Sequence, residues 1–334
     1  MIINELYKIA YKNKIPVKAT FELTYDCNLH CKHCYVVRRK GKKLTLEEWF
    51  KLIEKLRKLG TLSVTLTGGE PLLYTDFFEI ARKLREEKMA IYVITNGTLI
   101  DKKIVEKLKE IHPVEIGISI YGFKEKTHEK ITGVKGSHRR TMEAIKLLKE
   151  NDFNITLKII ITKYNIDEIE NLILFAKDLK INYQVDALIT PKDNGDNSPL
   201  QYRASQKAII KLAQQNEEIL RRCSNKFEDN ENLLCGAGIT TLTITPFGEI
   251  KPCIQMPLIC GNIRDTEIEE IWENSKELNM LRNIRAEDLK DCLKCELRPY
   301  CNRCPGLALI ESGDLRGKAL SSCWMAEISK KLQS

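Results

Sequence analysis

Three cysteines near the N-terminus have a spacing that suits metal binding. Cys27, Cys31 and Cys34 form C-x3-C-x2-C directly after a short β-branched segment. Soft thiolates suit iron–sulfur centres, and three on one loop can hold three corners of an iron–sulfur cube. The fourth iron would then be open to a substrate or cofactor. Because His30 and His33 lie in the same loop, a zinc site completed by a histidine is the alternative.

Glycine and polar residues follow the next segments of the same kind. Gly68, Gly69 and Glu70 come after the second segment, Asn96 follows the third, and Ser119 ends the fourth. In parallel α/β architectures, functional residues gather at the carboxyl ends of the strands. We therefore expect one site built from several strand ends. The alternatives are a strand-to-helix turn at the two glycines, a helix-start carboxylate at Glu70 and a simple turn at Asn96.

A second group of cysteines occupies the C-terminal third of the chain. Part of it has the spacing C-x2-C-x5-C-x2-C, which by itself could also be a small zinc knuckle. The cysteines of this region are Cys223, Cys235, Cys253, Cys260, Cys292, Cys295, Cys301, Cys304 and Cys323.

The elements that must position the first cysteines alternate between two patterns. Short β-branched runs predict buried strands, and amphipathic runs between them predict helices. The strands are expected at 17–24, 61–67, 90–95, 114–120, 155–161 and 181–189, and the later helices near 75–88, 101–110, 138–150, 167–179 and 205–222. The first helix is marked by a capping box of Thr45 and Glu48 and by Gly60 after its last turn. Six such units predict a parallel sheet, and both a partial barrel and a doubly wound sheet fit this periodicity.

The pattern changes after residue 190. A polar loop is followed by the helix near 205–222, by a predicted hairpin at 239–252 and by helical sequence at 267–282. Residues 284–325 are expected to be loop-like. We place an N-terminal extension at 1–16, an α/β domain at 17–222 and a small cysteine-rich α+β domain at 223–334.

Composition narrows the class of protein. The chain has 334 residues, 43% of them hydrophobic, which excludes a disordered chain and allows about two domains. It has no run of 18 apolar residues and no signal peptide, so we expect a cytoplasmic protein that does not enter a membrane. In that reducing compartment, its 12 cysteines favour metal binding or catalysis over disulfides. The net charge of +8 is spread over helices, and no basic run with aromatics indicates nucleic-acid binding.

The first cysteine loop and the Gly68-Gly69-Glu70 segment together resemble the radical S-adenosylmethionine (SAM) enzymes. The resemblance covers roughly residues 17–190 and implies a partial (β/α)6 TIM-like barrel. It also implies a [4Fe–4S] cluster on Cys27, Cys31 and Cys34 whose open iron binds SAM. Gly68, Gly69 and Glu70 are then cofactor-binding residues, and so are Asn96 and Ser119 by analogy with relatives. Tyr121 stands where many relatives have Asp, and Thr132 where many have Arg.

The later cysteines resemble the SPASM domain, which carries auxiliary iron–sulfur clusters, apart from one spacing of x2 in place of x3. The resemblance implies two auxiliary clusters of [4Fe–4S] type, in addition to the SAM cluster. It assigns Cys235, Cys253 and Cys304 to one, with Cys223 as a candidate fourth ligand or an iron left open. It assigns four others to the second cluster, namely Cys292, Cys295, Cys301 and Cys323. We expect Cys260 to be structural.

The combined resemblance implies an enzyme that cleaves SAM to a 5′-deoxyadenosyl radical and abstracts hydrogen from a ribosomally made precursor peptide. The product would be a crosslink, thioether, epimer or oxidised residue. Because few residues precede the first strand, we expect leader recognition by a separate protein. We also expect a flavodoxin- or ferredoxin-type electron donor. The alternatives are a cofactor-maturation enzyme such as a tetrapyrrole decarboxylase, and a non-catalytic metal-binding module.

Overall fold

The computed structural model describes residues 2–216, 219 and 235–333. Within them the strands form one nine-stranded sheet in the order β6-β5-β4-β3-β2-β1-β7-β8-β9. The strands are β1 (Lys18–Glu22), β2 (Ser63–Thr67), β3 (Ala90–Thr95), β4 (Glu115–Ser119), β5 (Ile155–Ile160), β6 (Asn182–Asp186), β7 (Thr241–Ile244), β8 (Glu249–Lys251) and β9 (Gly261–Asn262).

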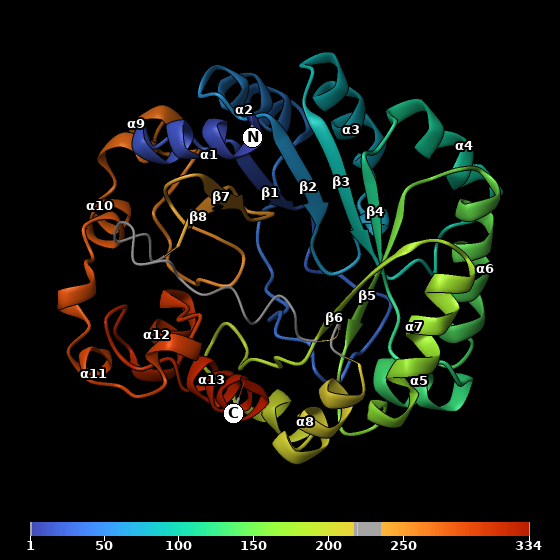
Figure 1. Cartoon of the computed structure of the whole chain (residues 1–334). Helices are drawn as coiled ribbons and strands as arrows, with labels where there is room; N and C mark the ends of the chain where they lie inside the picture. Colours follow the sequence, from blue (N-terminus) through green and yellow to red (C-terminus); the bar gives the residue numbers. More distant parts are fainter. Residues whose placement is uncertain (1, 217–218, 220–234, 334) are drawn as a thin grey trace.

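The first six strands pair in parallel in their order along the chain, each with the next. A doubly wound sheet reverses its strand order at a switch point, so the sequential order identifies the partial barrel. Figure 1 shows the strands as an arc with α2, α3, α4, α6 and α7 outside it. The helices of this part are α1 (Ile2–Lys12), α2 (Leu46–Lys58), α3 (Phe77–Glu86), α4 (Lys102–Ile111), α5 (Glu125–Thr132), α6 (Ser137–Glu150), α7 (Ile169–Asp178) and α8 (Gln206–Gln215).

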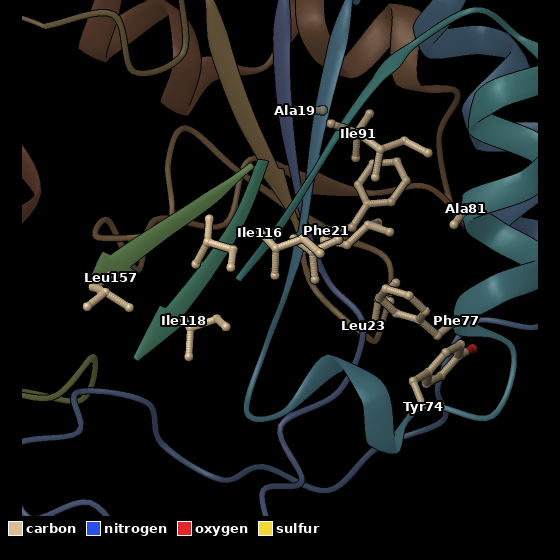
Figure 2. Packing of buried hydrophobic residues seen from close by; sticks show 14 of the residues in the cluster. Ala19, Phe21, Leu23, Tyr74, Phe77, Ala81, Ile91, Ile116, Ile118 and Leu157 are labelled. Carbon is tan, nitrogen blue, oxygen red and sulfur yellow. The ribbon is translucent and has the colours of Figure 1, made fainter. Parts of the chain in front are cut away.

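The core lies between the strands and the outer helices. Phe21 and Leu23 are fully buried, and the Phe21 ring lies 4.8 Å from that of Trp49 on α2. Figure 2 shows apolar side chains of β1, β3, β4 and β5 along the sheet, with Phe77 and Ala81 of α3 beside it in the same cluster. In β1 and β2 the buried apolar residues alternate with polar ones, so one face of the sheet packs against the helices.

The capping box and the terminal glycine predicted from the sequence are confirmed in α2. The Thr45 side chain accepts from the Glu48 backbone N–H, and the Glu48 carboxylate accepts from that of Thr45. Gly60 has a φ of 94° directly after the last turn. The helix expected at 205–222 is shorter in the structure: α8 ends at Gln215, because Asn216 is extended and forms its C-cap. Residues 217–218 and 220–234 lie outside the described part of the chain.

The C-terminal part continues the barrel sheet. The predicted hairpin is confirmed as β7 and β8, but β7 also pairs in parallel with β1. Arg264 adds two hydrogen bonds, of 2.6 and 2.9 Å, to the carboxylate of Glu48 on α2. The boundary placed at 222/223 stays a prediction, since the residues on its C-terminal side lie outside the described ones.

The expectation that 284–325 is loop-like is wrong. The helices of the C-terminal part are α9 (Ile268–Asn274), α10 (Lys276–Arg282), α11 (Lys290–Leu293), α12 (Pro305–Ser312) and α13 (Leu320–Gln333). Helix α12 has Pro305 at its first position and ends at Gly313, with φ of 76°. These are the usual helix start and stop residues. Because cysteines lie beside these helices, the sequence pattern is interpreted as a loop. The N-terminal extension likewise contains the helix α1.

Candidate active site

The loop of Cys27, Cys31 and Cys34 leaves β1 at its carboxyl end and is held by α5. The backbone N–H of His30 donates to the Thr132 carbonyl at 2.8 Å, and that of Lys32 donates to Ile131 at 3.0 Å. Thr132 therefore supports the loop through its backbone. The loop is fixed by the end of a helix from a distant part of the barrel.

The three thiols of this loop face one another at a cavity of about 310 Å³. Burial raises the pKa of all three thiols, and the charges of Cys27 and Cys34 each add to the rise at Cys31. Ligand cysteines must be thiolates, so cluster binding here releases protons. Three half-buried thiols around one cavity fit a [4Fe–4S] cluster with an open iron.

Gly68 and Gly69 are required because the backbone of another segment lies directly against them. A Cβ on Gly68 would lie 2.3 Å from the Thr24 carbonyl oxygen, and one on Gly69 would lie 2.3 Å from that of Asp26. Gly69 N–H donates to the Thr24 carbonyl at 2.7 Å. The segment after β2 thus lies directly against the segment after β1. Both glycines also line the cavity beside the thiols.

Glu70 is fully buried, and its carboxylate accepts three hydrogen bonds. Oε1 accepts from the Leu72 N–H at 3.1 Å and from the Thr95 hydroxyl at 2.7 Å, and Oε2 accepts from the Asn96 N–H at 2.8 Å. Burial raises the pKa of this carboxyl, against the hydrogen bonds, which favour its charged form. A carboxylate has about four acceptor sites, so Oε2 keeps capacity for one further donor. The cofactor-binding role of Glu70 remains a prediction.

Asn96 is bound to the cysteine loop. Its Nδ2 donates to Asn28 Oδ1 at 2.9 Å and lies 3.9 Å from Cys27 Sγ, while its Oδ1 accepts from the Thr98 hydroxyl at 2.6 Å. Asn28 donates in turn to the Thr98 hydroxyl at 2.8 Å. The side chain of Asn96 therefore positions the loop, and a direct contact with SAM stays a prediction. The sequence analysis did not single out Asn28 and Thr98.

Ser119 ends β4 and its side chain is hydrogen-bonded to Tyr121. The pKa of Tyr121 is raised well above its usual value, first by burial and next by the charge of Cys31. The ring of His33 packs edge-on against Tyr121 at 4.5 Å, and burial lowers the pKa of His33 to about 4. Tyr121 thus lies beside the thiols. A cofactor role of Ser119 remains a prediction.

Replacing Gly69 with alanine is expected to impair cluster assembly. The added Cβ must displace the Asp26 carbonyl, next to Cys27, at a cost of about 1–3 kcal/mol for overpacking. We expect a lower urea midpoint and less iron per chain. Gly313→Ala is the control, because its Cβ would meet nothing within 4 Å although its φ is positive. It should leave the iron content unchanged, and an equal iron content in the two variants would contradict the prediction.

The cysteines of the C-terminal part fall into two electrostatic groups. Cys253 interacts with Cys235 and Cys304, whereas Cys301 interacts with the other members of the second group. That second group is Cys292, Cys295, Cys301 and Cys323. Among the residues that the structure describes, no three His, Cys, Asp or Glu side chains converge closely enough to hold one metal ion. A cluster takes each thiolate at a separate iron, and the grouping matches the two expected ligand sets.

Helix geometry supports one of these ligands. Cys304 is the N-cap of α12, and its Sγ accepts from the Leu307 N–H at 3.5 Å. A thiolate is stabilised at a helix N-terminus. Cys223, the candidate fourth ligand, lies outside the described residues. Cys260 is buried within the main hydrophobic core and belongs to neither group, as expected for a structural cysteine.

An ion pair that the sequence analysis did not single out joins β1 to β8. Lys251 Nζ lies 3.0 Å from Glu22 Oε2, and the two side chains are 3% and 1% exposed. The Tyr25 hydroxyl donates to the same carboxylate at 3.1 Å. The sequence signal that could have revealed this ion pair is the presence of a charged residue in each of the two strands. The nearby Asp193, on the loop after β6, has its pKa raised to about 6, mainly by burial.

Comparison with family models identifies the class of protein. The model of the radical SAM superfamily matches residues 21–176, and the model of an iron–sulfur cluster-binding domain, SPASM, matches residues 235–305. The AdoMet-dependent heme synthase of Methanosarcina barkeri is 30% identical over 331 residues, which cover 90% of this chain and 94% of the relative. The chain belongs to the radical SAM superfamily.

It is an enzyme of the type with a SPASM domain, and it uses a [4Fe–4S] cluster, SAM and auxiliary iron–sulfur clusters. The Bacillus subtilis antilisterial bacteriocin subtilosin biosynthesis protein AlbA is 28% identical and covers 87% of this chain, with 67% of the relative covered. The PqqA peptide cyclase of Bradyrhizobium diazoefficiens is 26% identical and covers 88% of this chain and 83% of the relative.

The solved structures agree on the fold. Streptococcus suis SuiB bound to the precursor peptide SuiA superposes with a TM-score of 0.75 at 19% identity, covering 96% of this chain and 79% of SuiB. At this identity the likeness concerns the fold alone. No helix in the described residues is both long enough and apolar enough to cross a bilayer.

Proposed function

We propose that this enzyme abstracts a hydrogen atom from a residue of a ribosomally made precursor peptide and forms a crosslink, thioether, epimer or oxidised residue. The cluster with bound SAM supplies a 5′-deoxyadenosyl radical for this reaction. The proposal draws on relatives whose names denote bacteriocin biosynthesis and peptide cyclisation and which align over most of the chain. We also propose a cytoplasmic location, since free thiols persist in a reducing compartment.

The observation that carries the proposal is the position of Tyr35 relative to the two kinds of thiol. Burial raises the pKa of Tyr35 well above its usual value, and the negative charges of Glu22 and Asp193, followed by those of Cys34 and Cys253, add to the rise. One aromatic side chain therefore lies near the SAM loop and near the first auxiliary set. An auxiliary cluster at that set would accept the electron that a substrate radical gives up on oxidation, as crosslinking and thioether formation require.

The test is conversion of a candidate peptide by the reconstituted enzyme. We expect a short reading frame beside the gene to encode a substrate whose mass falls by about 2 Da per crosslink, because two hydrogens are lost. An epimer keeps its mass, so the chirality of the residues is measured as well. A peptide unchanged in both mass and chirality, with 5′-deoxyadenosine still formed, would contradict the peptide proposal. A separate leader-binding protein is part of this proposal, and tight binding of the leader to this chain alone would contradict that part.

A tetrapyrrole substrate is the second candidate, because a heme synthase is 30% identical over nearly its whole length. The cavity wall includes Lys32, Arg38 and Lys192, whose cations suit propionate groups. Incubation with a propionate-bearing porphyrin separates the candidates. Loss of about 46 Da per propionate, as one CO2 and two hydrogens when a hydrogen-abstracted propionate is oxidised to a vinyl group, would replace the peptide proposal.

A further inference from the structure

Three lysines surround two tyrosine rings beside the cysteine loop. Lys32, Lys130 and Lys163 have their Nζ atoms 5.3, 3.9 and 5.5 Å from the centroid of the Tyr164 ring. Lys32 and Lys163 also lie 6.0 and 5.5 Å from the centroid of the Tyr202 ring. We call these five residues the lysine–tyrosine face.

The lysine–tyrosine face carries positive charge without a matching negative partner. Among the described residues, none of its three lysines forms an ion pair. The carboxylate of Glu129, the neighbour of Lys130, accepts instead from the backbone N–H of Gly136. Three ammonium groups gathered around one ring repel one another, so an anionic surface placed on them gains interaction energy.

The same face is joined to the cysteine loop by the backbone. Lys32 lies between Cys31 and Cys34, and its N–H donates to the Ile131 carbonyl beside Lys130. The Lys163 N–H donates to the Tyr202 carbonyl at 2.9 Å. A partner on this face would therefore sit against the outside of the loop that holds the SAM cluster.

The extent of the lysine–tyrosine face favours a protein partner over a small ligand. Lys32 and Tyr202 line the cavity, but Lys130 and Lys163 do not, so the face extends from the cavity rim outward over α5 and the segment after β5. The cavity itself must admit SAM and substrate. A reductant is the partner that has to approach the cluster loop without entering the cavity.

We propose that the lysine–tyrosine face is the docking site of an acidic one-electron carrier protein of the flavodoxin or ferredoxin type. One electron leaves the reduced carrier, which is oxidised, and enters the SAM cluster, which is reduced, and no proton or group is transferred. The proposal rests on the radical SAM class of this enzyme and not on its substrate.

Binding to the apoprotein tests the face directly. The variant is Lys130→Gln/Lys163→Gln, and the matched control is Lys102→Gln/Lys103→Gln on α4, where both lysines are exposed. At low ionic strength we expect the Kd for an oxidised, negatively charged flavodoxin to rise about fivefold to tenfold in the variant and to stay unchanged in the control. The difference should shrink at high salt, because exposed charges are screened. Equal affinities of the two double variants would overturn the proposal.

Turnover of the reconstituted enzyme, without any substrate, gives the second readout. Formation of 5′-deoxyadenosine driven by reduced flavodoxin should fall in the Lys130→Gln/Lys163→Gln variant, while formation driven by dithionite should not. An equal fall with dithionite would overturn the proposal and assign the lysines to the SAM or substrate pocket. Neither experiment contains peptide or porphyrin. Both results would therefore stand even if the proposed peptide substrate were wrong.

Discussion

Replacing Cys27 with alanine is expected to reduce the yield of 5′-deoxyadenosine to the uncatalysed background. Cys27 is one of three thiols around the cavity, and its Sγ accepts from the Leu29 N–H and lies near Asn96 Nδ2. With two thiolates left, the loop loses one of the three corners that hold the cluster. The measurement is anaerobic incubation of the reconstituted variant with SAM and dithionite, followed by chromatography.

Cys260→Ala is the matched control for this experiment. It removes the same sulfur atom from a buried site in the main hydrophobic core, where the thiol donates to the Leu258 carbonyl at 3.7 Å. The yield of 5′-deoxyadenosine should be retained. Cys292→Ala, in the second auxiliary set, should lower the iron content but leave SAM cleavage in place. An unchanged yield in Cys27→Ala would contradict the assignment of the loop.

Replacing Lys251 with methionine is expected to destabilise the apoprotein by about 3–5 kcal/mol, the usual cost of leaving one charge of a buried pair without its partner. Without Lys251, the Tyr25 hydroxyl would be the one hydrogen-bond donor to the Glu22 carboxylate among the described residues. The other oxygen, Glu22 Oε1, already has no partner among them. Since the pair joins β1 to β8, the barrel and the C-terminal part are both affected. Urea unfolding followed by circular dichroism measures the change.

Two further variants isolate the effect of burial. Lys51→Met breaks an exposed pair of similar length, 2.8 Å to Glu47, and should leave the midpoint unchanged within error. The double variant Glu22→Gln/Lys251→Met removes both charges and should recover much of the lost stability. A Lys251→Met variant as stable as Lys51→Met would show that the buried pair contributes nothing.

The strands and helices of the barrel could be predicted because each of them has its own periodic pattern of apolar residues in the sequence. All six barrel strands and the capped helix α2 lie where the β-branched runs and the Thr45–Glu48 box predict them. Helices α12 and α13 were not predicted, because cysteines and small residues obscure their apolar faces. The pairing of β7 with β1 is a contact over more than 200 residues of sequence, which no local pattern can indicate.

By itself, the sequence determined the class of chemistry, because the type and spacing of cysteines decide which cofactor a loop can hold. It also pointed to strand ends as the place of the site. Only the tertiary structure decided what each polar residue contacts. It placed Gly68 and Gly69 directly against the backbone of the segment after β1, and it buried Lys251 against Glu22. It also joined Glu70 to Asn96, and Asn96 to the cysteine loop. Hydrogen bonds and burial depend on neighbours that the chain brings together only when it folds, so the residue types alone could not reveal these roles.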